Sequence, residues 1–197
     1  YSICEGAIKI DALKEFCKEN KINSIGLSDT SNLCGSLEFS ENISKAGAQP
    51  IIGTQINFTY ENTTGLLPLI ALNRSGYKRI LELSSKSYLQ NSTISDPELN
   101  ISELLENGKD IIVFSGSISG LFGKLFDKGK FEDIKKLYKK LSTILSDRFY
   151  LEIQRHGDKN EIEFEKYNLK ISTELKIPII ATNEVFYIHK DMYDAHD

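Results

Sequence analysis

Strand-like and helix-like patterns alternate along almost all of the 197-residue chain, and this alternation constrains its fold most strongly. Such alternation indicates a mainly parallel sheet with helical crossovers, either an open doubly wound sheet or a closed barrel. Strands are expected at residues 22–27, 50–60, 66–72, 111–114, 149–153 and 177–182, and helices after Asp11 and at residues 33–46, 75–90, 101–106, 121–126, 131–145 and 162–175.

Four segments carry more specific expectations. Asp11 is expected to cap the first helix through its side chain. The turn signal at residues 61–65 predicts an antiparallel hairpin, and residues 91–100 read as a polar loop. The run at residues 111–114 has no polar alternation, which predicts a strand buried on both faces.

Nucleotide-binding loops are absent from the strand ends. No strand is followed by a Gly-x-Gly-x-x-Gly or a Gly-x-x-x-x-Gly-Lys-Ser/Thr loop, which removes the commonest nucleotide-binding open sheets and slightly favours a barrel. In a barrel, functional side chains sit at the carboxyl ends of the strands.

The composition is that of an ordinary folded domain. The formal net charge is -4, so there is no electrostatic reason to expect strong nucleic-acid binding. The lysines of residues 128–140 alternate with acids and predict a solvated helix face. The three cysteines are too widely spaced for a Cys-x-x-Cys pair, which favours reduced thiols in a cytoplasmic protein.

Neither a membrane-spanning run nor a secretory leader is visible in the sequence. The chain begins at Tyr1 without a methionine and stops after Asp197 in a polar stretch. We therefore expect residues 1–197 to be a single domain from a longer protein, with the extreme amino-terminal segment missing.

Four acidic or imidazole side chains are expected near strand ends, namely Glu5, Asp29, His156 and Glu184. Together they could bind a divalent ion that lowers the pKa of water and makes a hydroxide nucleophile. Each also has a structural interpretation. Asp29 precedes Thr30-Ser31-Asn32 and could form an Asx-turn or cap a helix. His156 could have a hydrogen-bonded structural role near its glycine turn, and Glu184 could orient a loop.

The Gly116-Ser117-Ile118-Ser119-Gly120 loop is a further candidate. It does not have the Gly-x-Ser-x-Gly spacing of a nucleophile elbow. Its backbone N–H groups could nevertheless bind an anion at the start of a helix. A tight strand-to-helix turn is the favoured interpretation. An unrelated barrel enzyme that binds a small phosphorylated molecule at this loop is the corresponding functional alternative.

The ordered set of motifs resembles the PHP (polymerase and histidinol phosphatase) domain at the amino-terminal end of bacterial C-family replicative polymerases, the DNA polymerase III alpha subunits. The resemblance covers essentially the whole chain and implies a distorted seven-stranded βα barrel. Its anchors are Tyr1-Ser2 before Glu5-Gly6, Asp29 with Asn32-Leu33-Cys34-Gly35, Pro50-Ile51-Ile52-Gly53, Asn73 with Gly76-Tyr77, Ser115-Gly116, Phe149-Tyr150-Leu151-Glu152, Ala181-Thr182-Asn183 and Ala195-His196-Asp197.

The resemblance also implies where metal ligands would lie. Metal-binding members of the family hold up to three divalent ions in a mostly histidine cluster, part of which precedes Tyr1. Glu5 keeps a carboxylate, whereas most other ligand positions carry residues that cannot replace an imidazole or a carboxylate. These altered positions are Thr30, Gln55, Leu66, Ser117, and the Glu184-Val185-Phe186 that stands where the family has Asp-x-His.

The resemblance therefore implies a domain with no catalytic residues and no metal or other cofactor of its own. It is expected to brace the polymerase and to dock the separate proofreading exonuclease subunit. DNA contact, nucleotidyltransferase activity and Mg²⁺ would belong to the remainder of the polymerase chain, and a membrane partner is not expected. The alternative is a residual phosphoesterase or 3'-5' exonuclease that binds Zn²⁺ or Mn²⁺ through Glu5, His156 and Glu184.

Overall fold

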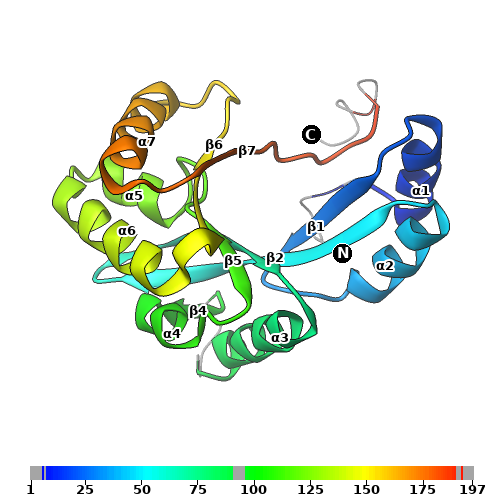
Figure 1. The fold of residues 1–197 in the computed structure, drawn as a ribbon, viewed down its shortest axis with the longest axis horizontal. Helices are drawn as coiled ribbons and strands as arrows, with labels where there is room; N and C mark the ends of the chain where they lie inside the picture. The colour runs from blue at the N-terminus through cyan, green and yellow to red at the C-terminus, as the bar shows by residue number, and fades with distance from the viewer. Residues whose placement is uncertain (1–5, 7, 91–95, 190–191, 193–197) are drawn as a thin grey trace.

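The computed structural model describes residue 6, residues 8–90 and 96–189, and residue 192. Strands and helices alternate through these residues as the sequence predicts (Figure 1). The elements are α1 (Ile10–Glu19), β1 (Ser24–Thr30), α2 (Ser36–Lys45), β2 (Gln49–Tyr60), β3 (Thr63–Ala71), α3 (Arg74–Leu89), β4 (Glu98–Asn100), α4 (Ile101–Asn107), β5 (Ile111–Phe114), α5 (Leu121–Asp127), α6 (Phe131–Leu145), the 3₁₀ turn η1 (Ser146–Arg148), β6 (Phe149–Ile153), α7 (Glu161–Leu175) and β7 (Ile179–Ala181).

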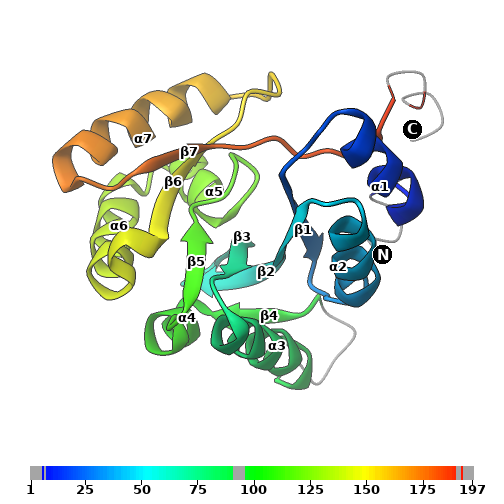
Figure 2. The ribbon, with the colours of Figure 1, turned by 45° about the vertical axis from the view of Figure 1, so that its right-hand side comes forward.

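The seven strands form one curled sheet, which confirms the predicted seven-stranded α/β architecture. The strand order is β1-β2-β3-β5-β6-β7, and β4 pairs with β2 outside this path. The β2–β3 and β3–β5 ladders are antiparallel, and the remaining ladders are parallel. No ladder joins β1 to β7 within the described residues, so the sheet is a half-barrel (Figure 2).

Helices cover the convex face of this half-barrel (Figure 1). Burial alternates along β2: Ile56 and Phe58 are fully buried, whereas Gln55 and Asn57, which precede them in turn, are only half-buried. Since successive side chains of a strand point to opposite faces, one face packs on the helices and the concave face stays partly accessible.

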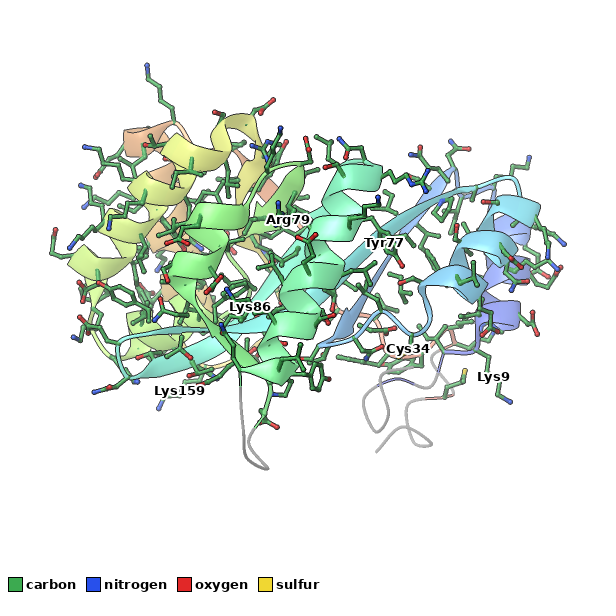
Figure 3. All side chains as sticks on the ribbon, turned by 90° about the horizontal axis from the view of Figure 1, so that it is seen from below. Lys9, Cys34, Tyr77, Arg79, Lys86 and Lys159 are labelled. Atoms are coloured by element: carbon green, nitrogen blue, oxygen red, sulfur yellow. The ribbon has the colours of Figure 1, made fainter. Side chains whose placement is uncertain are left out.

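Two apolar clusters lie under the helices. The main core joins β2–β6 with α3–α7, and its larger side chains include Phe58, Phe122, Tyr138 and Phe149. A smaller cluster between α1, α2 and β1 contains Cys17, Phe39, Ile43 and Ala48. Lys86 on α3 donates to Glu103 on α4 at 2.5 Å and so ties together two helices of the lower face (Figure 3).

Three local predictions are wrong. Ile112 and Phe114 are half-buried while Ile111 and Val113 are fully buried, because no helix among the described residues covers the concave face, so β5 is not buried on both faces. Residues 91–95 of the expected loop at 91–100 lie outside the described residues, but residues 98–100 form β4, which is too short to produce a periodic pattern. Asp11 makes no cap, since α1 begins at Ile10 without a side-chain cap.

The predicted hairpin is confirmed, and it explains part of the lysine cluster. β2 and β3 pair antiparallel from Gly53 opposite Ile70 to Tyr60 opposite Thr63, next to the turn. Lys128 Nζ donates to the Asn62 carbonyl at 3.1 Å and to Thr63 Oγ1 at 2.7 Å. This lysine therefore holds the hairpin turn against the end of α5, whereas Lys139 and Lys140 are exposed on α6 as expected.

Among the described residues, no helix combines the length and the apolar character that crossing a membrane requires.

Candidate functional site

The strands β1, β2, β5, β6 and β7 run in the same direction, so their carboxyl ends lie at one edge of the half-barrel, which we call the rim. Thr30 ends β1, Ser117 follows β5, His156 follows β6 and Glu184 follows β7. These four predicted positions therefore belong to elements that converge on the rim, whereas Gln55 lies within β2 and Leu66 lies on the antiparallel β3. Glu5 lies outside the described residues.

Thr30 and Gln55 are register partners on neighbouring parallel strands. Both residues are half-buried. The following loop is organised by Asn32, whose Oδ1 accepts from the Cys34 N–H at 3.0 Å and whose Nδ2 donates to the Thr30 carbonyl at 3.0 Å. On this side of the rim the paired positions thus offer a hydroxyl and an amide rather than an imidazole and a carboxylate.

The glycine and serine loop after β5 is a tight turn. Gly120 N–H donates to the Ser117 carbonyl at 3.0 Å, and Gly116 has a φ of 81°. A Cβ added to Gly120 would lie 2.8 Å from the Leu66 carbonyl oxygen, so the loop rests directly on β3. The Ser117 and Ser119 hydroxyls bond to each other at 2.8 Å. This arrangement confirms the favoured interpretation of the loop as a strand-to-helix turn.

His156, Glu184 and Phe186 are exposed, and Phe186 retains 37% of its accessible surface. The backbone N–H groups of His156 and Gly157 donate to the Glu161 carboxylate at 3.0 Å and 2.8 Å. Burial acts to raise the pKa of Glu161, but these N–H groups and the His156 charge outweigh it and lower that pKa. The turn after β6 is therefore held by Glu161 through backbone N–H groups, while the His156 side chain is exposed.

A buried polar cluster at the end of β6 was not predicted as a functional feature. Glu152 Oε1 accepts hydrogen bonds from the Thr182 hydroxyl and from Gln154 Nε2, the latter at 3.2 Å, and Gln154 Nε2 also lies 3.1 Å from Thr182 Oγ1. The Glu152 N–H donates to Ser115 Oγ at 2.9 Å. The one available signal was a charged residue inside the apolar strand Phe149–Ile153.

Burial raises the pKa of Glu152, and the nearby Glu184 charge acts in the same direction, although hydrogen bonds from Thr182, Gln154 and the Gly116 N–H oppose them. Only 4% of the Glu152 surface is exposed. Glu152 is the most strongly buried of the described carboxyl groups at the rim, and its surroundings disfavour its ionised form.

The donor set at the rim does not fit the metal cluster that the family resemblance implies. Within the parts of the chain that the structure describes, no three His, Cys, Asp or Glu side chains are placed to hold a metal ion. Thr30 and Gln55 are neutral, and Leu66 offers no side-chain donor. Divalent ions in such sites need deprotonated or imidazole ligands, and several of these are replaced here.

Comparison with known proteins gives one family and one set of relatives. The family model for the PHP domain matches residues 1–156. DNA polymerase III alpha subunits match the whole chain at 37% identity in Rickettsia felis, 34% in Caulobacter vibrioides and 30% in Vibrio cholerae. The chain spans 16%, 18% and 17% of these three relatives, about a sixth of their length.

A solved structure shows the same fold. The crystal structure of a protein from Bifidobacterium adolescentis, described as a metal-dependent phosphoesterase, aligns with a TM-score of 0.57 over 90% of this chain and 82% of its own. Sequence identity is 12%, so this likeness concerns the fold alone.

Proposed function

Because the chain belongs to the PHP domain family, we propose that it is a catalytically silent PHP domain, which braces a replicative DNA polymerase alpha subunit and docks the proofreading exonuclease subunit. The full-length match to DNA polymerase III alpha subunits supports the polymerase context. DNA synthesis, its Mg²⁺ and contact with DNA would belong to the rest of that polymerase, which acts in the cytoplasm.

The observation that carries the proposal is the donor set of the rim. Thr30 and Gln55 stand side by side where the family resemblance implies an imidazole and a carboxylate. Ser117 bonds to Ser119, and Phe186 brings an apolar ring to the segment after β7. A site without these ligands should not compete with hydration for a divalent ion.

Metal binding and hydrolysis test the catalytic half of this proposal. We expect the 197-residue chain to take up no stoichiometric Mn²⁺ or Zn²⁺ and to hydrolyse no generic phosphodiester in their presence. Stoichiometric metal together with turnover that disappears in Glu5→Ala and His156→Ala, but persists in the control His189→Ala, would instead establish the residual phosphoesterase.

Binding of the exonuclease subunit tests the docking half. The chain, and the polymerase that contains it, should retain the exonuclease subunit of the same organism in a titration or a pull-down. If the polymerase still bound the exonuclease subunit after this domain was deleted, and the domain alone did not bind it, the docking role would be refuted. Only the bracing role would then remain.

A further inference from the structure

Two buried oxygen atoms at the end of β6 have no hydrogen-bond donor within the described residues: Glu152 Oε2 and Gln154 Oε1. Their residues are only 4% and 8% exposed. Both atoms are acceptors, and their residues are already joined through Gln154 Nε2 and Glu152 Oε1 at 3.2 Å. An unpaired buried acceptor destabilises the folded state, and an unpaired buried carboxylate destabilises it more.

The charged groups around Glu152 do not favour its ionisation. Glu161 and Glu165 line the same small cavity from α7, and Glu184 acts on Glu152 from the segment after β7. The nearby guanidinium of Arg155 is held by Glu165 in two hydrogen bonds of 3.0 Å and 2.7 Å. The Gly116 N–H and the Thr182 hydroxyl supply only partial positive charge.

We propose that Glu152 is a neutral carboxylic acid, which donates the proton on its Oε2 to Gln154 Oε1 while Gln154 Nε2 donates to Glu152 Oε1. A proton on Glu152 Oε2 gives both this oxygen and Gln154 Oε1 a hydrogen-bond partner. The acid and the amide are then joined by two hydrogen bonds that close a ring. Burial raises the pKa of Glu152 and so acts in the direction that this pairing requires.

The acid and amide pair has a mechanical role. It holds Thr182 at the end of β7, and from there the chain crosses from the β6 side toward α1 (Figures 1 and 2). Ionised Glu152 would instead repel Glu184 in this same segment. The pair therefore fastens the crossing segment to the main core and adds no negative charge that could attract a metal ion to the rim.

The linkage between protonation and folding has a definite sign. A carboxyl group whose pKa is raised in the folded state stabilises the fold when protonated, and this stabilisation is lost as the pH rises through the folded-state pKa. Between the unfolded-state pKa and the folded-state pKa, the folding equilibrium constant of the wild-type chain should fall about tenfold per pH unit relative to a chain with a permanent amide at this position, and above the folded-state pKa it should fall no further.

Glu152→Gln supplies that permanent amide, and Glu106→Gln on α4 is the matched control because Glu106 is exposed. Urea unfolding of the three chains between about pH 5 and about pH 9 should show the wild type losing stability relative to Glu152→Gln as the pH rises. The difference in the free energy of unfolding between the wild type and Glu106→Gln should not grow in the same way as the pH rises. A constant gap between the wild type and Glu152→Gln would overturn the proposal.

Carbon-13 NMR of the glutamate carboxyl groups in the wild-type chain gives a direct test that does not depend on a variant folding. The Glu152 resonance should stay at its protonated position where the exposed glutamates have ionised. The cavity, at about 10 Å³, could also take one water molecule or one bare cation. A Glu152 signal that titrates with the exposed glutamates would overturn the proposal and indicate a water molecule or a cation in the cavity. Stabilisation of the wild type by Mn²⁺, without stabilisation of Glu152→Gln, would indicate the cation.

Discussion

The two sides of the half-barrel are packed differently. On the amino-terminal side, α1 and α2 bury a small cluster centred on Phe39 and Ile43 against β1. On the other side, β3, β5 and β6 with their helices enclose the main core. The rim follows the same division, since Thr30 and Gln55 are half-buried whereas Glu152 is enclosed. Substitutions should therefore act locally on the first side and on the whole fold on the second.

The largest effect is expected from matched cavities in the two clusters. Leu69 on β3 and Ile43 on α2 are both fully buried, and truncating either to alanine should cost about 2–5 kcal/mol. Hydrogen exchange should distinguish them, because Leu69→Ala weakens the main core and should speed exchange across β3, β5 and β6. Ile43→Ala should speed it chiefly in α1 and α2. Uniform acceleration in Ile43→Ala would show that the two sides unfold as one unit.

Glycines in strands on the two sides provide the next comparison. A Cβ at Gly65 would lie 2.4 Å from the Leu121 nitrogen, so Gly65→Ala must displace the start of α5. We expect a loss of about 1–3 kcal/mol in the free energy of unfolding, measured in urea. At Gly26 the nearest atom would be 3.9 Å away, and Gly26→Ala should stay within about 0.5 kcal/mol of the wild type. Equal losses would contradict the looser packing of β1.

Glu161 tests how far charge, rather than packing, holds the β6 side of the rim. Glu161→Gln weakens the two N–H bonds from His156 and Gly157, at an expected cost of about 1 kcal/mol at neutral pH. Because folding lowers the pKa of Glu161, its contribution is present above the unfolded-state pKa and is lost as the pH falls through the folded-state pKa. Urea unfolding should thus show the gap closing in acid. Glu163→Gln, an exposed change on the same helix, should show a smaller gap.

The sequence predicted the elements of the fold well because their signals are local. The apolar spacing of α6 and the hairpin turn before β3 are both visible within a short window. β4 was missed because its three residues are held by pairing with Asn57–Thr59, which only the folded chain provides. The concave face was misjudged at β5 for a similar reason, since a strand does not reveal whether a second layer will cover it.

The rim could be predicted by position but not by its contacts. The strand ends indicated that Thr30, Ser117 and His156 would share one edge. The Glu152 cluster depends on Thr182, which follows a different strand, and on two oxygens that have no donor among the residues the structure describes. Such pairing across 30 residues leaves no pattern in a single sequence.

The smallest effects are expected from exposed ion pairs, and one pair on each side completes the comparison. Lys135 on α6 lies 2.6 Å from Glu174 on α7, whereas Lys45 and Glu41 lie 3.8 Å apart within α2. Solvent screens both pairs, so a double-mutant cycle on each should give a coupling below all the preceding effects. The Lys135 pair joins two helices and should give the larger coupling, which should weaken in high salt. A larger coupling for the Lys45 pair would show that the amino-terminal side depends more on its surface charges than its small core suggests.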